Sequence, residues 1–131
     1  MKYTAVSGSH GFLGERLVRA LGQPKRLDRD GKISRGIKVV FDLAAYGNMA
    51  GHKADPYEVY LANTLRVAKS LQDIKGTKIK FIYMSTSSVS LPVQTFYSAS
   101  KKATEEMIQI AVRDWGIRAV IARPYTIIGR G

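Results

Sequence analysis

The chain alternates between runs of consecutive apolar residues and longer stretches whose apolar residues recur at helical spacing. Residues 12–21 place Leu13, Leu17, Val18 and Leu21 on one helical stripe. Runs such as IKVVFDLAA instead suit strands that are covered on both faces of a parallel sheet. The pattern predicts strands over residues 2–7, 26–27, 37–45, 78–86 and 117–124, and helices over residues 12–21, 56–75 and 96–115.

Strands that alternate with helices are typical of an α/β fold. The sequence therefore predicts a minimal Rossmann-like open parallel sheet with helices on both faces. The length of 131 residues suits one domain with a real core but is too short for two. We expect residues 1–131 to form a single dinucleotide-binding domain, for the reasons given by the motifs below.

The amino-acid composition excludes several kinds of functional site. The chain has no cysteine, which excludes disulfides, thiolate zinc sites and cysteine nucleophiles, and we expect no metal site. The first residues lack the apolar run of a signal peptide, and no stretch reaches the length needed to span a membrane. These features favour a cytoplasmic protein with no membrane partner.

The charge is unusual, because the chain has 21 Lys and Arg residues and only 10 Asp and Glu residues, which gives a formal net charge of +11. Such a field attracts nucleotides, nucleic acid or an acidic partner. The densest basic segment runs from Lys25 to Lys38 and is interrupted by two aspartates, so a solvated loop explains it equally simply. No docking motif or combined basic and aromatic platform is recognisable in the sequence, so we do not expect specific nucleic-acid binding.

Three glycines follow the first predicted strand, in the pattern G-x-x-G-x-x-G. Gly8 permits a tight turn, Gly11 lets the backbone approach a pyrophosphate, and Gly14 allows close packing of helix on strand. The following helix offers free N–H groups and the positive end of its dipole to phosphates. Glycines also serve ordinary turns, but the strand before and the helix after favour nucleotide binding.

Two further motifs lie in the second half of the chain. Tyr97 and Lys101 form a Y-x-x-x-K pair, one turn apart on a predicted helix. An ammonium beside a phenol favours the phenolate and would lower its pKa. The segment MSTSSVS, residues 84–90, places hydroxyls where a strand leaves the sheet. Alone, the pair could be an exposed helix face, and the hydroxyls could simply satisfy their own backbone.

Together and in this order, the motifs resemble those of the extended short-chain dehydrogenase/reductases, the group of NAD-dependent epimerases and dehydratases. The resemblance covers nearly the whole chain. Besides the glycines, it rests on FDLAAYG after the third predicted strand, YLANTLRVAKSL, FIYMSTSSVS, YSASKKATE and IARPYTIIGRG.

The resemblance implies a catalytic set and a cofactor site. Tyr97 would exchange a proton with a substrate hydroxyl, Lys101 would tune it and bind the nicotinamide ribose, and Thr86 would orient the substrate. The residues implied for cofactor binding are Gly8, His10, Gly11, Phe12, Leu13, Gly14, Asp28, Arg29, Leu43, Ala44, Ala45, Asn63, Tyr97, Lys101 and Pro124.

The cofactor is expected to be NAD, with NADP as the alternative. Asp28 would accept hydrogen bonds from ribose hydroxyls and repel a 2′-phosphate. Arg29, Lys32 and Arg35 could instead bind that phosphate.

The chain departs from the family pattern in three ways. The segment after Asp28 leads quickly into IKVVFDLAA, so the family's third strand is expected to be absent, giving the order 2-1-4-5-6 in the family's numbering. The connection from Thr86 to Tyr97 is short, and the sequence ends where a substrate domain would begin.

The leading hypothesis is accordingly an NAD(P)-dependent dehydrogenase or epimerase-like enzyme acting on a nucleotide sugar or small hydroxy compound. The alternative is a non-catalytic dinucleotide-binding or sensing module. The resemblance also implies a homodimer paired through helices at about residues 57–73 and 97–113, both apolar over a wide arc.

Overall fold

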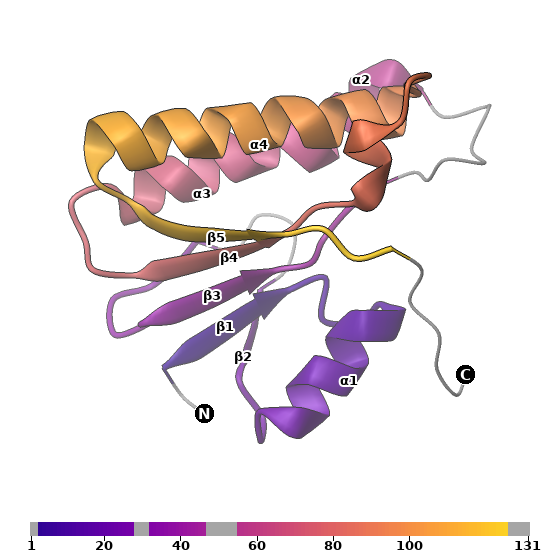
Figure 1. Ribbon diagram of the computed structural model, residues 1–131. Coiled ribbons are helices and arrows are strands. Elements are labelled where there is room, and N and C mark those ends of the chain that lie inside the picture. Colours follow the sequence, from indigo (N-terminus) through magenta and orange to yellow (C-terminus); the bar gives the residue numbers. More distant parts are fainter. Residues whose placement is uncertain (1–2, 28–31, 47–54, 126–131) are drawn as a thin grey trace.

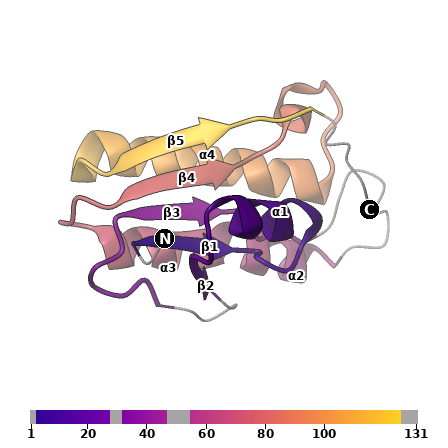
Figure 2. The same cartoon turned by 90° about the horizontal axis from the view of Figure 1, so that it is seen from below.

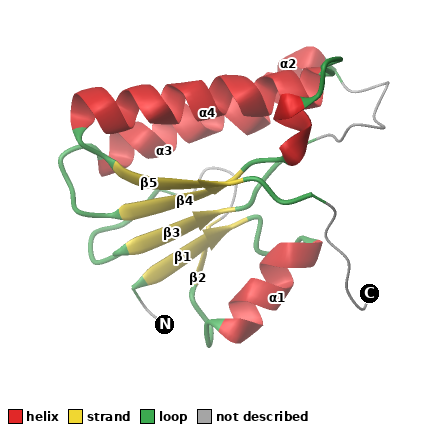
Figure 3. Ribbon diagram, viewed as in Figure 1, coloured by secondary structure: helices red, strands yellow, loops and turns green. Residues whose placement is uncertain are grey.

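The computed structural model describes residues 3–27, 32–46 and 55–125. Its elements follow in the order β1 (Thr4–Ser7), α1 (Phe12–Ala20), β2 (Lys25–Leu27), β3 (Val39–Asp42), α2 (Pro56–Tyr60), α3 (Arg66–Ile74), β4 (Lys80–Met84), α4 (Phe96–Trp115) and β5 (Arg118–Ala122). A π-helical turn, Leu61–Leu65, joins α2 to α3, and a 3-10 turn, Ser87–Ser90, follows β4. Figure 3 shows helices and strands alternating along the chain.

The five strands form one parallel sheet in the order β2-β1-β3-β4-β5. Helices α2, α3 and α4 cover one face of the sheet, and α1 covers the other (Figure 1). This arrangement confirms the Rossmann-like fold. Within the described residues no strand lies outside β2, which agrees with the predicted strand order that lacks the family's third strand.

The two faces of the sheet are covered unequally. Side chains from the central strands pack beneath α3 and α4, where Val40, Phe81, Val67, Leu71 and Ile108 are all buried. On the opposite side α1 lies over the half of the sheet that contains β1, and among the described residues no helix covers β5 there (Figure 2). The core is therefore concentrated between the sheet and α3–α4.

Helix α4 has the bounds that the sequence predicts, because both of its ends are capped. The Thr95 hydroxyl accepts from the N–H of Ser98, while the Ser98 hydroxyl accepts from the N–H of Thr95 at 2.9 Å, a capping box. At the other end Gly116 has φ 68°, the left-handed conformation that ends many helices. No helix of the described residues is long and apolar enough to cross a membrane.

The predicted continuous helix over 56–75 is wrong at its centre, where the π-helical turn interrupts it. Contacts from α4 hold this turn from outside. The Thr104 hydroxyl donates to the Asn63 carbonyl at 2.6 Å, and the Thr64 hydroxyl donates to the Ser100 carbonyl at 3.0 Å. Such tertiary contacts override local helix propensity, and π-turns often mark functional sites.

Candidate functional site

The glycine turn between β1 and α1 lies at the carboxyl ends of the strands, and its three glycines have different roles. Gly8 has φ 68°, and a Cβ there would lie 2.7 Å from the Ala44 nitrogen. A Cβ on Gly14 would lie 1.9 Å from the Gly8 carbonyl oxygen. A Cβ on Gly11 would meet only that oxygen, at 3.4 Å. Gly8 and Gly14 are thus required by packing, whereas the space above Gly11 is free for a bound group.

Three side chains that the sequence analysis did not connect brace this turn. Arg26 of β2 donates to the Ser9 carbonyl at 3.1 Å and to the Glu15 carboxylate at 3.0 Å. His10 lies 3.5 Å from the same carboxylate. The Arg26 hydrogen bond holds the pKa of Glu15 below its usual value. The turn is therefore tied to both α1 and β2, a relation that no spacing in the sequence reveals.

The two residues after Gly11 begin α1. Phe12 is exposed, and the Arg16 guanidinium lies 3.8 Å from its ring centre. Leu13 is half-buried. Gly11 is the N-cap residue and offers no side-chain acceptor, so the first N–H groups of this nine-residue helix are left for another partner.

Beneath the end of β3 lies a buried ion pair that the sequence analysis missed. Arg66 of α3 donates to both oxygens of Asp42, at 2.6 and 3.0 Å, and also to the Ala44 carbonyl at 3.0 Å. The Ser7 hydroxyl donates to Asp42 at 2.7 Å and accepts from the N–H groups of Leu43 and Ala44. The only signal in the sequence was a lone acid inside an apolar run. Asp42 thereby fixes the backbone that faces Gly8.

Asn63 holds the next part of the same loop. Its side-chain oxygen accepts from the Tyr46 N–H at 2.8 Å, and its side-chain nitrogen donates to the Tyr46 carbonyl at 2.9 Å. The same nitrogen donates to the Ser100 hydroxyl at 3.1 Å. Asn63, which is buried, thus positions the segment that contains Ala45 instead of facing solvent.

Thr86 and Tyr97 come together at the end of β4. Thr86 caps the 3-10 turn by accepting from the Ser88 N–H at 3.2 Å. Burial raises the pKa of the Tyr97 phenol, and the neighbouring Thr86 side chain acts in the opposite direction. The Pro124 carbonyl accepts from the Ser87 N–H at 3.1 Å, which places Pro124 beside the same turn.

Lys101 is buried, with 2% of its surface exposed. Its Nζ donates to the Met84 carbonyl at 2.6 Å and lies 4.5 Å from the centre of the Tyr83 ring. Burial lowers the pKa of this ammonium to about 8. Sequence analysis expected the ammonium to lower the pKa of Tyr97, but in this structure that pKa is raised. The tuning role of Lys101 stays a prediction.

A second buried carboxylate supports this end of the site. Glu105 of α4 accepts from the Ser85 hydroxyl and from the Arg123 guanidinium. Because Ser85 follows β4 and Arg123 follows β5, the two strand ends are fastened to α4 one turn beyond Lys101.

The structure therefore gathers most of the expected site residues at one edge of the sheet. The glycine turn, the Leu43–Ala45 segment and the Thr86–Tyr97 pair follow β1, β3 and β4, which are neighbours. Asp28 and Arg29 lie outside the described residues. Open space at Gly11 and an uncapped helix N-terminus fit the pyrophosphate of a dinucleotide laid across these strand ends.

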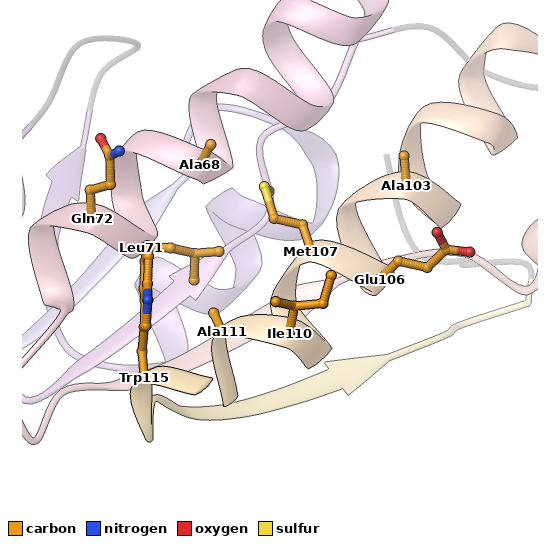
Figure 4. Close-up of a pocket in the computed structure, with 9 residues that line it drawn as sticks. All are labelled: Ala68, Leu71, Gln72, Ala103, Glu106, Met107, Ile110, Ala111 and Trp115. Atoms are coloured by element: carbon orange, nitrogen blue, oxygen red, sulfur yellow. The ribbon is translucent and has the colours of Figure 1, made fainter. Parts of the chain in front are cut away.

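A separate apolar groove of about 390 Å³ lies between α3 and α4. Leu71 and Ala68 of α3 face Met107, Ala103 and Ile110 of α4 across it, with Trp115 at one end (Figure 4). It contains none of the expected cofactor or catalytic residues.

Comparison with known proteins agrees with this geometry. UDP-glucuronic acid 4-epimerase from Bacillus cereus, in complex with NAD, is 23% identical, with a TM-score of 0.80 over 98% of this chain and 57% of that one. RMD from Pseudomonas aeruginosa, complexed with NADPH, is 24% identical, with a TM-score of 0.82 over 100% of this chain and 55% of that one. UDP-N-acetylglucosamine 4-epimerase from Methanobrevibacter ruminantium, in complex with UDP-N-acetylmuramic acid, is 22% identical, with a TM-score of 0.76 over 93% of this chain and 54% of that one.

These likenesses show the fold, and the chain spans little more than half the length of the three proteins. No curated protein sequence matches it. The model of the NAD dependent epimerase/dehydratase family, however, matches residues 4–131. The chain therefore belongs to the NAD-dependent epimerase/dehydratase family.

Proposed function

We propose that this chain binds NAD(P) across the carboxyl ends of β1, β3 and β4 and supports a dehydrogenase- or epimerase-like reaction on a nucleotide sugar or small hydroxy compound. The observation that carries the proposal is that Thr86 lies close enough to the Tyr97 phenol to affect its pKa, at the same sheet edge as the glycine turn. Two hydroxyl groups held together there can both contact one substrate oxygen.

Each part of the site has a defined task in this proposal. The turn around Gly11 and the N-terminus of α1 hold the pyrophosphate, and the Leu43–Ala45 backbone, fixed by Asp42 and Asn63, lines the middle of the site. The nicotinamide ring, when bound, supplies hydride transfer. Tyr97 holds or accepts the proton of the substrate hydroxyl, while Thr86 orients that hydroxyl.

The protonation states of Tyr97 and Lys101 determine whether Tyr97 can donate or abstract a proton. A phenol whose pKa is raised stays protonated at neutral pH, so it suits proton donation unless a positive charge approaches. Lys101 has a pKa of about 8 and is bonded to Met84. Movement of its ammonium toward Tyr97 would favour the phenolate and enable proton abstraction.

The experiment begins with calorimetric titration of NAD and NADP. NAD is expected to bind more tightly, through Asp28, and a preference for NADP would assign Arg29 to the 2′-phosphate. Turnover is then measured with UDP-glucuronic acid and UDP-N-acetylglucosamine, the sugars named for the similar enzymes.

A Tyr97→Phe variant should lose about 10²–10⁴-fold in turnover with unchanged cofactor affinity, the usual worth of general acid–base catalysis. Lys101→Ala should lower both the turnover and the affinity for the cofactor. Tyr57→Phe on α2, an exposed tyrosine, is the matched control. Full turnover by Tyr97→Phe would remove the tyrosine from the mechanism.

A non-catalytic dinucleotide sensor is the second candidate. It is favoured by the hydrogen bond that engages the Lys101 ammonium with Met84 instead of Tyr97. Dinucleotide affinity without turnover of any hydroxy compound would support it.

We also propose that the part of the α3–α4 groove around Ala103 and Ile110 pairs with the same surface of a second copy, and that Trp115 stays exposed at the end of the groove. Ile110 of α4 and Leu65 of the π-helical turn before α3 are exposed apolar residues, and isologous pairing is the commonest way to bury such a face. A cytoplasmic location belongs to the same set of proposals and rests on composition alone.

A further inference from the structure

The amino ends of the strands form the edge of the sheet opposite the dinucleotide site, and cations line this edge. Lys25, Lys80 and Arg118 are the first residues of β2, β4 and β5, and Lys38 directly precedes β3. In Figure 1 the starts of β3, β4 and β5 and the ends of α3 and α4 lie together at one side of the molecule.

The loops at this edge add more cations. We call the whole set the amino-edge surface; its members are all exposed and comprise Lys25, Arg35, Lys38, Lys75, Lys78, Lys80 and Arg118. Two of them are in direct register on neighbouring strands, Lys80 beside Arg118. Like charges in that position repel each other across the roughly 5 Å between strands.

Little within the described chain neutralises this surface. None of its cations forms an ion pair with a carboxylate in the part of the chain that the structure describes. Two described acids lie in the last turns of α3 and α4. Asp114 is paired with Arg113 at 2.6 Å, so Asp73 is the one that could offset the charge of this surface. The carboxyl ends of α3 and α4 supply only about half a negative charge each. The described residues therefore leave this surface positively charged, and such a surface attracts external anions.

Two exposed aromatic rings accompany the cations. Tyr3 is 45% exposed, and the Lys38 Nζ lies 4.9 Å from its ring centre. Trp115 is 40% exposed, and the Lys75 Nζ lies 4.4 Å from its ring centre. Cations beside exposed rings are the combination that binds single strands, since phosphates contact the cations and unpaired bases stack on the rings.

We propose that the amino-edge surface binds single-stranded nucleic acid without sequence specificity. The phosphates would follow the row from Lys25 through Lys38 and Lys80 to Arg118, which crosses four strand spacings or about 19 Å. Bases would stack on Tyr3 and Trp115. The aromatic rings favour this ligand over an acidic protein segment, which has no bases to stack. Dinucleotide binding at the opposite edge would be independent of it.

The sequence analysis recognised no platform of basic and aromatic residues, whereas the fold assembles one. The sequence scatters these cations over more than ninety positions, so no basic and aromatic platform is visible in it. The parallel sheet brings them together because every strand starts at the same edge.

The test uses fluorescein-labelled oligo(dT) and anisotropy at several salt concentrations, with Lys38→Gln/Lys80→Gln compared with Lys69→Gln/Lys102→Gln. Lys69 and Lys102 are exposed cations on α3 and α4 outside the amino-edge surface, so both double variants lose the same charge. Each lost phosphate contact should lower the salt slope by about 0.7 and the affinity at 0.1 M salt by about 5-fold, or roughly 25-fold for the pair. The control pair should bind like wild type.

Trp115 gives a second readout, because it is the single tryptophan of the chain. Oligo(dT) should quench its fluorescence, and Trp115→Leu should weaken binding while circular dichroism stays unchanged. Equal losses in the two lysine pairs would overturn the proposal in favour of net charge alone. Tighter binding of poly-glutamate than of oligo(dT) would overturn it in favour of an acidic protein partner. Binding of oligo(dT) without quenching would overturn the stacking of bases on Trp115.

Discussion

The Nζ of Lys101 donates a 2.6 Å hydrogen bond to the backbone carbonyl of Met84, the last residue of β4. This bond ties the first turns of α4 to the strand end that leads to Thr86. It also keeps an ammonium in the interior, where it is costly in its charged form.

The first prediction concerns the pH dependence of stability. The pKa of Lys101 falls from 10.5 to about 8 on folding. Between these values the unfolded chain binds more protons than the folded one, so the free energy of unfolding should rise with pH from about 8 to 10.5, by about 3 kcal/mol for this group. Urea unfolding of wild type and Lys101→Met across pH 7–10 would measure it.

The tyrosines with raised pKa values, Tyr83 and Tyr97, act in the opposite sense. Their ionisation in the unfolded chain lowers stability above about pH 10. The comparison therefore uses the difference between wild type and Lys101→Met. Parallel pH profiles for the two proteins would contradict a depressed Lys101 pKa.

The arrangement of Lys101 also shows what the sequence could and could not predict. The fold and the bounds of α4 were predictable, because strands, helices and the Thr95 and Gly116 caps are determined locally. The bond from Lys101 to Met84 and the π-turn at Asn63 depend on packing between distant segments. Neither has a local signal. Helix spacing places Lys101 one turn after Tyr97 but does not predict that its ammonium contacts the Met84 carbonyl.

The same reason explains why the pair Asp42–Arg66 was missed. The two residues are 24 positions apart and are joined only because α3 lies across the end of β3. The glycine turn was predictable in contrast, since all of its steric requirements except the contacts of Gly8 with Leu43 and Ala44 lie within seven residues.

The second prediction is that Arg66 matters for stability through Asp42. Arg66→Met leaves a buried carboxylate unpaired and should cost about 3–5 kcal/mol. Asp42→Asn in addition should restore part of the loss, because it removes the stranded charge. Arg113→Met, whose partner Asp114 is exposed, should change stability little. Chemical denaturation of wild type, Arg66→Met, Asp42→Asn and the double variant gives the coupling, and simple additivity of the two changes would argue against a paired role.

The third prediction separates the glycines. Gly11→Val should fold normally, because its Cβ approaches only one atom at 3.4 Å, yet should weaken dinucleotide binding by about tenfold or more, at about 1.4 kcal/mol per factor of ten. Gly14→Ala should instead destabilise the fold, since its Cβ would lie 1.9 Å from a backbone oxygen. Calorimetry with NAD and thermal melts distinguish the two. A folded Gly11→Val with wild-type affinity would place the cofactor elsewhere.

The last prediction is that the chain pairs through the groove between α3 and α4. Ile110 is 50% exposed at this groove, so Ile110→Glu would place a carboxylate in the paired surface and should give a monomer, where wild type has twice the monomer mass. Gln109→Glu, also exposed on α4 but outside the groove lining, adds the same charge and should leave the dimer intact.

The net charge of +11 opposes association. Salt screens the repulsion between exposed charges beyond about 10 Å at 0.1 M, but it does not weaken the burial of apolar surface. The dimer should therefore tighten as salt rises. Light scattering at tens of micromolar and two salt concentrations measures this, and a wild-type monomer at moderate salt with NAD present would refute the pairing.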